Sequence, residues 1–232
     1  LGYADSDKTS LINFLKTKNY TEKQILEAGL AVEREGKSVD KFRNRVMFPI
    51  IDVRGNIIGF GGRTMLDVKE INGYKIPKYL NSSETAAFDK GRNLFSLNLA
   101  KNAKSDKLIL CEGYMDVIAM HQAGFTNAVA SLGTAFTSQH AMLIKRYTDQ
   151  VILTYDSDGA GVKAALRAIP ILKEVGISCK VLNMKPYKDP DEFIKNMGRE
   201  AFQQRIDEAQ SSFLFEVEVL ERQYNLKDPA QK

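Results

Sequence analysis

The chain has 232 residues, of which 44% are hydrophobic and 27% are charged, and its formal net charge is +4. This length suits one large domain or two to three small ones with a sizeable core. The sequence contains no run of 18 apolar residues that would indicate a transmembrane helix, and no signal-peptide pattern. Because the first residue is Leu1, we expect a fragment of a longer protein.

Two cysteines, Cys111 and Cys179, both stand in apolar runs typical of strands. We expect reduced core thiols there and no disulfide, which favours an intracellular protein. Two cysteines and two distant histidines cannot form a zinc site at these spacings. No zinc is therefore expected in this fragment.

Charge is distributed unevenly along the chain. Residues 1–104 carry 18 Lys and Arg against 12 Asp and Glu, residues 105–197 carry ten of each, and residues 198–232 carry five against seven. A basic part beside a part with clustered acids suits a polyanion held near a metal ion. An ordinary solvated surface is the alternative interpretation.

Short helices are predicted first, over residues 6–18 and 21–28, with Ser6 and Thr21 as candidate N-caps. Residues 43–63 then predict a β-hairpin. Its Gly-Phe-Gly-Gly stretch is not a Walker phosphate loop, because no Gly-Lys-Ser/Thr follows it. We expect these glycines to permit close approach of another backbone.

Basic side chains accompany this hairpin and the extended segments after it. The candidates for binding phosphate are Arg43, Arg45, Arg63, Lys78, Lys90 and Arg92. Aromatic residues are interleaved with them, as on a surface that stacks single-stranded bases, although core packing would explain the same aromatics. Each cation taken alone is also consistent with a solvated side chain.

From residue 105 the pattern alternates between strands and helices. Strands are predicted over 107–111, 127–130, 150–155 and 178–183, with helices over 114–123, 138–146 and 160–175 between them. Such short connections predict a mainly parallel sheet with right-handed crossovers, an α/β fold in this part and α+β for the chain as a whole. Helices over 199–208 and 211–223 follow.

Acidic residues follow three of the predicted strands. They are Glu112, Asp156 with Asp158, and Asp189 with Asp191. Ligands of open α/β sheets bind beyond the carboxyl ends of the strands, and carboxylate oxygens suit Mg²⁺ or Mn²⁺. The pattern predicts one or two divalent cations that bridge phosphate oxygens. Helix capping is the alternative interpretation for Asp158 and for Asp189 or Asp191.

These segments resemble the motifs of known families. Residues 110–116 and 155–161 resemble the glutamate and Asp-x-Asp motifs of the Toprim fold, which bacterial primases, topoisomerases and some nucleases share. Residues 43–50, 59–63, 77–82 and 90–95 are similar, in this order, to motifs of bacterial replicative DNA primase of the DnaG type. The resemblance covers essentially the whole chain.

The resemblance implies the central RNA polymerase core of such a primase. Its lobes would be a basic α+β lobe (1–104), a Rossmann-like Toprim lobe with a mainly parallel sheet flanked by helices (105–197), and a helical lobe (198–232). The implied reaction is synthesis of short RNA primers on single-stranded DNA for chromosome replication. In it, a ribose 3′-hydroxyl attacks the α-phosphorus of a ribonucleoside triphosphate, and pyrophosphate leaves.

The resemblance also implies roles for residues and partners. Glu112, Asp156 and Asp158 would hold two or more Mg²⁺ or Mn²⁺ ions, with Asp189 and Asp191 as further catalytic acids. The six basic residues would bind template and nucleotide, and Asp116 is not assigned as a ligand. The implied partners are single-stranded DNA, ribonucleoside triphosphates, the RNA primer, and the replicative helicase through a C-terminal domain absent here. We expect a cytoplasmic monomer at the replication fork in the nucleoid, with no membrane partner.

Two other interpretations are left open. A Toprim topoisomerase needs a tyrosine nucleophile placed by a separate domain, and no tyrosine here has such a context. A non-catalytic Toprim scaffold would bind DNA without copying it. Retention of all the acids favours the enzyme, and a template-copying assay separates the two.

Overall fold

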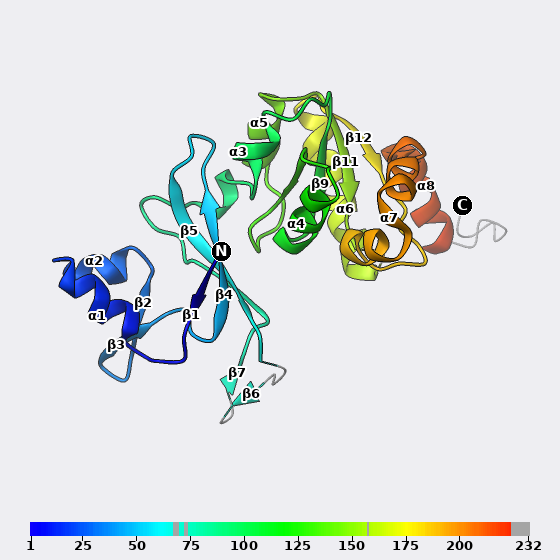
Figure 1. Ribbon diagram of the computed structural model, residues 1–232. Helices are drawn as coiled ribbons and strands as arrows, with labels where there is room; N and C mark the ends of the chain where they lie inside the picture. Colours follow the sequence, from blue (N-terminus) through cyan, green and yellow to red (C-terminus); the bar gives the residue numbers. More distant parts are fainter. Residues whose placement is uncertain (67–69, 72–73, 157, 224–232) are drawn as a thin grey trace. The chain divides into compact units, whose positions relative to one another are not determined.

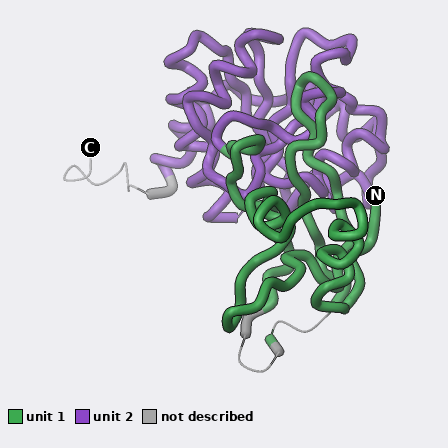
Figure 2. The backbone as a smooth tube through the Cα atoms, turned by 90° about the vertical axis from the view of Figure 1, so that its left-hand side faces the viewer, with its two compact units in different colours: residues 1–90 green, residues 91–232 purple. Residues whose placement is uncertain are grey.

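The computed structural model describes residues 1–66, 70–71, 74–156 and 158–223. The chain divides into two compact units, residues 1–90 and residues 91–232, which Figure 2 colours separately. Residues 224–232 of the expected helical lobe lie outside the described residues, as does Ser157 of the Asp-x-Asp motif. Within the described part of the chain, no helix is long and apolar enough to cross a membrane.

The first unit contains an antiparallel sheet with the strand order β1-β4-β5-β8. Its strands are β1 (Gly2–Ala4), β4 (Arg45–Ile51), β5 (Ile57–Thr64) and β8 (Tyr79–Asn81) (Figure 1). The predicted hairpin is confirmed as β4 and β5, with Val46 opposite Arg63. The short edge strand β1 has no counterpart among the predicted elements.

Two helices and two small hairpins complete this unit. They are α1 (Ser10–Thr17), α2 (Glu22–Glu27), β2 (Ala31–Arg34) with β3 (Lys37–Asp40), and β6 (Glu70–Ile71) with β7 (Tyr74–Lys75). The predicted cap at Thr21 is confirmed, because its side chain accepts a hydrogen bond from the backbone N–H of Gln24.

The predicted cap of the first helix at Ser6 is wrong. The buried carboxylate of Asp40 accepts the backbone N–H groups of Leu11 and Ile12, at 2.7 and 3.0 Å, and so satisfies the start of α1 from another element. A cap supplied from a distant strand leaves no local sequence pattern, which is why the sequence does not reveal it.

Arg45 is the most buried cation of the first unit, with 4% of its surface exposed. Its guanidinium donates hydrogen bonds to the carbonyl oxygens of Pro77 (2.8 Å), Gly62 (3.2 Å) and Lys78 (3.3 Å). A Cβ at Gly62 would lie only 2.9 Å from Cδ of Arg45. The glycine therefore makes room for a side chain, not for another backbone as the sequence suggested.

The second unit contains a five-stranded sheet with the order β10-β9-β11-β12-β13. Its strands are β9 (Leu108–Cys111), β10 (Ala128–Ala130), β11 (Gln150–Thr154), β12 (Ser178–Val181) and β13 (Gln210–Ser211). The first four run parallel, as predicted, and β13 pairs antiparallel with β12. β13 was not predicted, because two residues are too few to show a strand period.

Helices flank this sheet (Figure 1). They are α3 (Leu97–Ala100), α4 (Tyr114–Gln122), α5 (Ser138–Lys145), α6 (Gly159–Glu174), α7 (Pro190–Asp207) and α8 (Ser212–Gln223). The 3₁₀ turn η1 (Lys90–Arg92) contains the point in the sequence where the two units are divided. Fully buried Ile109, Met120 and Phe202 belong to one core cluster between the sheet and the helices. Gly198, with φ of +82°, separates the two helical segments of α7.

Residues 91–104 were assigned to the first lobe from the motifs, and the structure joins them to the second unit. Phe95 and Ala130 form an antiparallel β-bridge, so this segment adds to the outer edge of the parallel sheet. Buried Leu94 and Leu97 lie on either side of that bridge.

Replacing Arg45 with Ala should lower the free energy of unfolding by about 2–4 kcal/mol, because one buried and two partly buried backbone carbonyls lose a charged donor. Arg45→Lys should restore little of this, since an ammonium cannot reproduce the planar fork. Urea unfolding of both variants measures the loss. Arg54→Ala, in the exposed hairpin turn, is the control and should change stability by less than about 0.5 kcal/mol. Equal stability of Arg45→Ala and Arg54→Ala would contradict this role.

Candidate functional site

Glu112 and Asp156 lie together at the carboxyl edge of the parallel sheet. β9 and β11 are neighbouring strands with Cys111 opposite Thr154, so the residues that follow them emerge side by side. The backbone N–H of Asp156 donates a hydrogen bond to Oε1 of Glu112 at 3.1 Å. Burial, and then the charge of Asp156, raise the pKa of Glu112 above its usual range.

Gly161, in the first turn of α6, makes this close arrangement possible. A Cβ there would lie 2.1 Å from the carbonyl oxygen of Asp156 and 2.7 Å from Oε1 of Glu112. Both distances are far below a normal contact. The glycine therefore determines how closely the helix can approach the acids, a role the sequence did not reveal.

Asp158 caps α6, which confirms the alternative interpretation of this residue. Its Oδ1 accepts the backbone N–H groups of Ala160 and Gly161, both at 2.9 Å, and these bonds lower its pKa. Its charge still contributes to raising the pKa values of Glu112 and Asp156. Asp158 therefore caps α6 and also contributes its charge to the acid cluster.

Asp116 is the functional candidate that sequence reasoning left unassigned. It lies in the first turn of α4, and its pKa is raised to about 7. Burial is the largest cause, followed by the charges of Asp189 and Asp156. The sequence signal was its spacing of four residues from Glu112, which is common for any acid near a helix start.

Asp189 and Asp191 lie at the start of α7. Asp189 is the N-cap and accepts the backbone N–H of Glu192 at 2.8 Å, while Asp191 forms an ion pair with Lys195 at 2.6 Å. The charge of Asp189 raises the pKa of both Asp116 and Asp156. Through that charge, the α7 start belongs to the same electrostatic cluster.

Lys188 introduces a cation into this cluster to which the sequence analysis assigned no role. Its Nζ lies 3.3 Å from Oδ2 of Asp156, and this interaction raises the pKa of Lys188. The backbone N–H of Lys188 donates a hydrogen bond to Oε2 of Glu192, which holds the backbone just before α7. One positive charge therefore offsets part of the repulsion between the acids.

The donor chemistry of the cluster fits a hard divalent cation. Glu112, Asp116 and Asp156 all have raised pKa values, so a cation among them would relieve burial and mutual repulsion together. In the part of the chain that is described, no three acids already converge on one metal position.

The predicted basic residues fall into both units. Arg43, Arg45, Arg63, Lys78 and Lys90 lie in residues 1–90, and Arg92 lies in residues 91–232. Arg45 is committed to backbone carbonyls, as described above, and orders the chain around Lys78. Arg45 and Arg63 lie near each other in the hairpin, opposite Thr64 and Val46 respectively.

Three basic side chains, Lys41 and two of the predicted set, make specific contacts within their own units. Lys41 donates to Oγ of Ser83 at 2.6 Å, and its pKa is lowered by partial burial and then by the charge of Lys90. Nε of Arg92 donates to Oε1 of Gln139 at 3.0 Å. Lys78 lies over the ring of Tyr79, with 5.6 Å from Nζ to the ring centroid.

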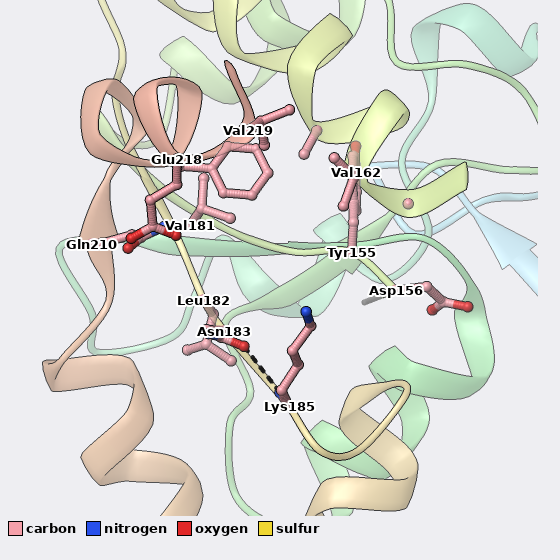
Figure 3. Close-up of a pocket in the computed structure, with 13 residues that line it drawn as sticks. Tyr155, Asp156, Val162, Val181, Leu182, Asn183, Lys185, Gln210, Glu218 and Val219 are labelled. Atoms are coloured by element: carbon pink, nitrogen blue, oxygen red, sulfur yellow. Dashed lines mark hydrogen bonds between the residues drawn. The ribbon is translucent and has the colours of Figure 1, made fainter. Parts of the chain in front are cut away.

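A small pocket of about 60 Å³ lies between α6, β12 and α8 (Figure 3). Val162, Val181 and Val219 contribute to its apolar lining, and Oδ1 of Asn183 accepts the backbone N–H of Lys185 at its rim. In Figure 3 the carboxylate of Asp156 points away from the apolar lining. We therefore separate this pocket from the acid cluster.

Comparison with family models divides the chain in two. A model described as the N-terminal domain of the DNA primase catalytic core matches residues 1–101, and a Toprim-like model matches residues 109–194. A DNA primase of Clostridium acetobutylicum is 47% identical over 229 residues, covering 98% of this chain and 37% of that protein. A DNA primase of Escherichia coli K12 is 41% identical over 224 residues, covering 93% and 37%. The chain therefore spans well under half the length of these curated relatives.

Solved structures of primase catalytic domains match nearly the whole chain. The E. coli primase catalytic core has a TM-score of 0.86 and 38% identity, with 99% of this chain and 73% of that chain covered. A DnaG primase catalytic domain bound to single-stranded DNA has a TM-score of 0.86 and 38% identity, with 99% and 74% covered.

Gly161→Ala should lower the free energy of unfolding by about 1–3 kcal/mol, because the new Cβ collides with the Asp156 backbone and with Glu112. Gly159→Ala is the matched control, since a Cβ there meets nothing within 4 Å. Because alanine reduces the backbone freedom of the unfolded chain, that variant should be as stable as the wild type or more stable. Urea unfolding compares the two, and equal stability of Gly161→Ala and wild type would exclude the close contact.

Asp116→Asn should stabilise the metal-free protein increasingly as the pH rises from about 4 to about 7. The raised pKa means that the folded wild type holds a proton that the unfolded chain releases, so wild-type stability falls over this window and levels off above it. The gain at pH 8 should reach up to about 4 kcal/mol. Exposed Asp106→Asn is the control, and thermal unfolding at several pH values is the measurement. A pH-independent difference would contradict the raised pKa.

Proposed function

The chain belongs to the DNA primase family, as part of its catalytic core, and on that premise we propose that it copies single-stranded DNA into short RNA primers. The observation that carries the proposal is the acid cluster at the carboxyl edge of the parallel sheet. Glu112 and Asp156 lie in direct contact there, and the charges of Asp158 and Asp189 act on them or on their neighbours. A cluster of this kind, in a protein of this family, suits nucleotidyl transfer.

Glu112, Asp156 and Asp158 would hold Mg²⁺ or Mn²⁺. Oδ1 of Asp158 is occupied by the cap of α6, and its other oxygen remains available for a cation. Asp116, Asp189 and Asp191 would add negative charge beside these ligands, consistent with two or more ions. The bound cations would neutralise charge that develops on the phosphates.

The chain's own residues would then bind and orient the reactants. Arg43, Arg63, Lys78, Lys90 and Arg92 would contact the template and the triphosphate, with Arg45 holding the segment that carries Lys78. Gln139 would orient the Arg92 guanidinium through its hydrogen bond to Nε. A solved relative whose name records bound single-stranded DNA supports that template class.

The proposal extends to the setting in which the reaction occurs. Ribonucleoside triphosphates would be the substrates, the primer would be the product, and a replicative helicase would be engaged by parts of the protein beyond this chain. The chain would act as a monomer at the replication fork. We retain residues 1–104, 105–197 and 198–232 as its proposed functional lobes.

The test is incorporation of labelled ribonucleotides onto an RNA primer annealed to single-stranded DNA. Supplying the primer separates extension from initiation, which is useful because the chain spans 37% of the relatives' length. Wild type should make product with Mg²⁺ or Mn²⁺ and none with EDTA. Asp156→Ala should reduce the rate by at least about 100-fold, since it removes a ligand for transition-state charge.

Asp149→Ala is the matched control, because Asp149 is an exposed acid just before β11, at the opposite end of that strand. It should retain the wild-type rate. Full activity of Asp156→Ala would contradict the site. DNA binding without any metal-dependent synthesis by wild type would favour a non-catalytic scaffold instead.

A further inference from the structure

A larger pocket opens beside Glu112, and none of the roles assigned above uses it. Its volume is about 350 Å³, which falls in the range of roughly 300–1,000 Å³ typical of small-molecule sites. The wall is formed by the end of β9, the loop between β10 and α5, the residue after β11, and α6. The lining residues that matter are Glu112, Ser131, Thr134, Phe136, Tyr155 and Arg167.

Three polar side chains of this pocket have no partner among the described residues. Ser131, Thr134 and Arg167 make no hydrogen bond or ion pair there, although Ser131 is only 8% exposed. The pocket therefore offers hydrogen-bonding groups that the fold itself does not use.

The charges of the pocket restrict the ligand. Among the described residues that line the pocket, Arg167 is the one cation, and one guanidinium matches one phosphodiester group. A triphosphate carries several negative charges and would need more cations than this lining provides. The Ser131 and Thr134 hydroxyls match ribose hydroxyls, while Phe136 and Tyr155, at 9% and 8% exposure, supply an apolar wall.

The position of Glu112 indicates which end of a nucleic acid chain would enter. Glu112 lines the pocket and also accepts the N–H of Asp156, so the pocket opens directly beside the acid cluster. We infer that this pocket binds the 3′-terminal ribonucleotide of the growing RNA, with its phosphodiester on Arg167 and its ribose facing Ser131 and Thr134. The inference rests on the proposed polymerase function and identifies the primer side of that site.

Extension kinetics of Arg167→Ala test the inference. KM for the primer–template should rise about 10-fold or more, which corresponds to losing one charge-assisted contact, while KM for the next ribonucleoside triphosphate should stay unchanged. Arg167→Lys should recover part of the loss because it keeps the charge. Lys163→Ala, an exposed cation on the same helix outside the pocket, is the control and should behave as wild type.

A rise in KM for the triphosphate, with KM for the primer unchanged, would overturn the assignment. So would an unchanged KM for both. Thermal unfolding of each variant shows that the fold is intact, as expected for an exposed arginine. Arg167 is therefore a safer first substitution than buried Ser131.

Ser131→Ala tests the contact with ribose. Wild type should extend a primer ending in a ribonucleotide with a lower KM than one ending in a 2′-deoxyribonucleotide. Ser131→Ala should reduce this preference by about fivefold, in line with one neutral hydrogen bond. An unchanged preference would place the ribose elsewhere.

The same variants separate failure of the inference from failure of the proposed function. If wild type extends no primer, the polymerase proposal fails. Fluorescence anisotropy with an RNA–DNA duplex carrying a recessed RNA 3′-end then tests the pocket alone. Arg167→Ala should weaken binding of that duplex more than binding of single-stranded DNA, and equal weakening of both would overturn the pocket assignment.

Discussion

Repulsion between carboxylates at one sheet edge is the constraint around which the second unit is arranged. Neighbouring parallel strands β9 and β11 end in register, so Glu112 and Asp156 emerge together, and Gly161 lets α6 approach them closely. Asp158 caps the N-terminus of α6, and Lys188 offsets part of the charge on Asp156. Partial burial and mutual repulsion raise the pKa values of Glu112, Asp116 and Asp156, and a divalent cation would relieve both.

In the first unit, a buried cation stabilises the fold. Arg45 has the sequence context of a phosphate ligand, yet its guanidinium is enclosed by backbone carbonyls of residues 62, 77 and 78. A glycine at position 62 is needed because that side chain lies over it. The result is an ordered segment carrying Lys78.

Much of the second unit could be predicted from local pattern. The apolar strands, the helices between them and the acids that follow the strands all obey short-range rules, so the parallel sheet and its acidic edge could be predicted. The missed features depend on contacts between distant parts of the chain. Asp40 caps α1 from β3, and Arg45 donates to the carbonyl of Pro77, 32 residues further along the chain. Neither contact leaves a local periodic signal.

Individual site residues were ambiguous for a related reason. Asp158 could be read as a cap or as a ligand, and the structure shows that capping uses only one of its oxygens. Asp116 looked like an ordinary acid near a helix start until its burial and the charges around it were known. The hydroxyl of Ser131 became informative only once its place in the pocket lining was known.

The central claim is that this acid edge binds divalent cations, and calorimetric titration with Mn²⁺ near pH 6.5 tests it most directly. Wild type should bind Mn²⁺ and release protons, seen as a dependence of the heat on buffer ionisation, because a cation expels the proton held by the cluster. Asp156→Asn should bind at least about 10-fold more weakly, since one charged ligand is lost. Equal Mn²⁺ affinity of the two proteins, with no proton release, would contradict the account.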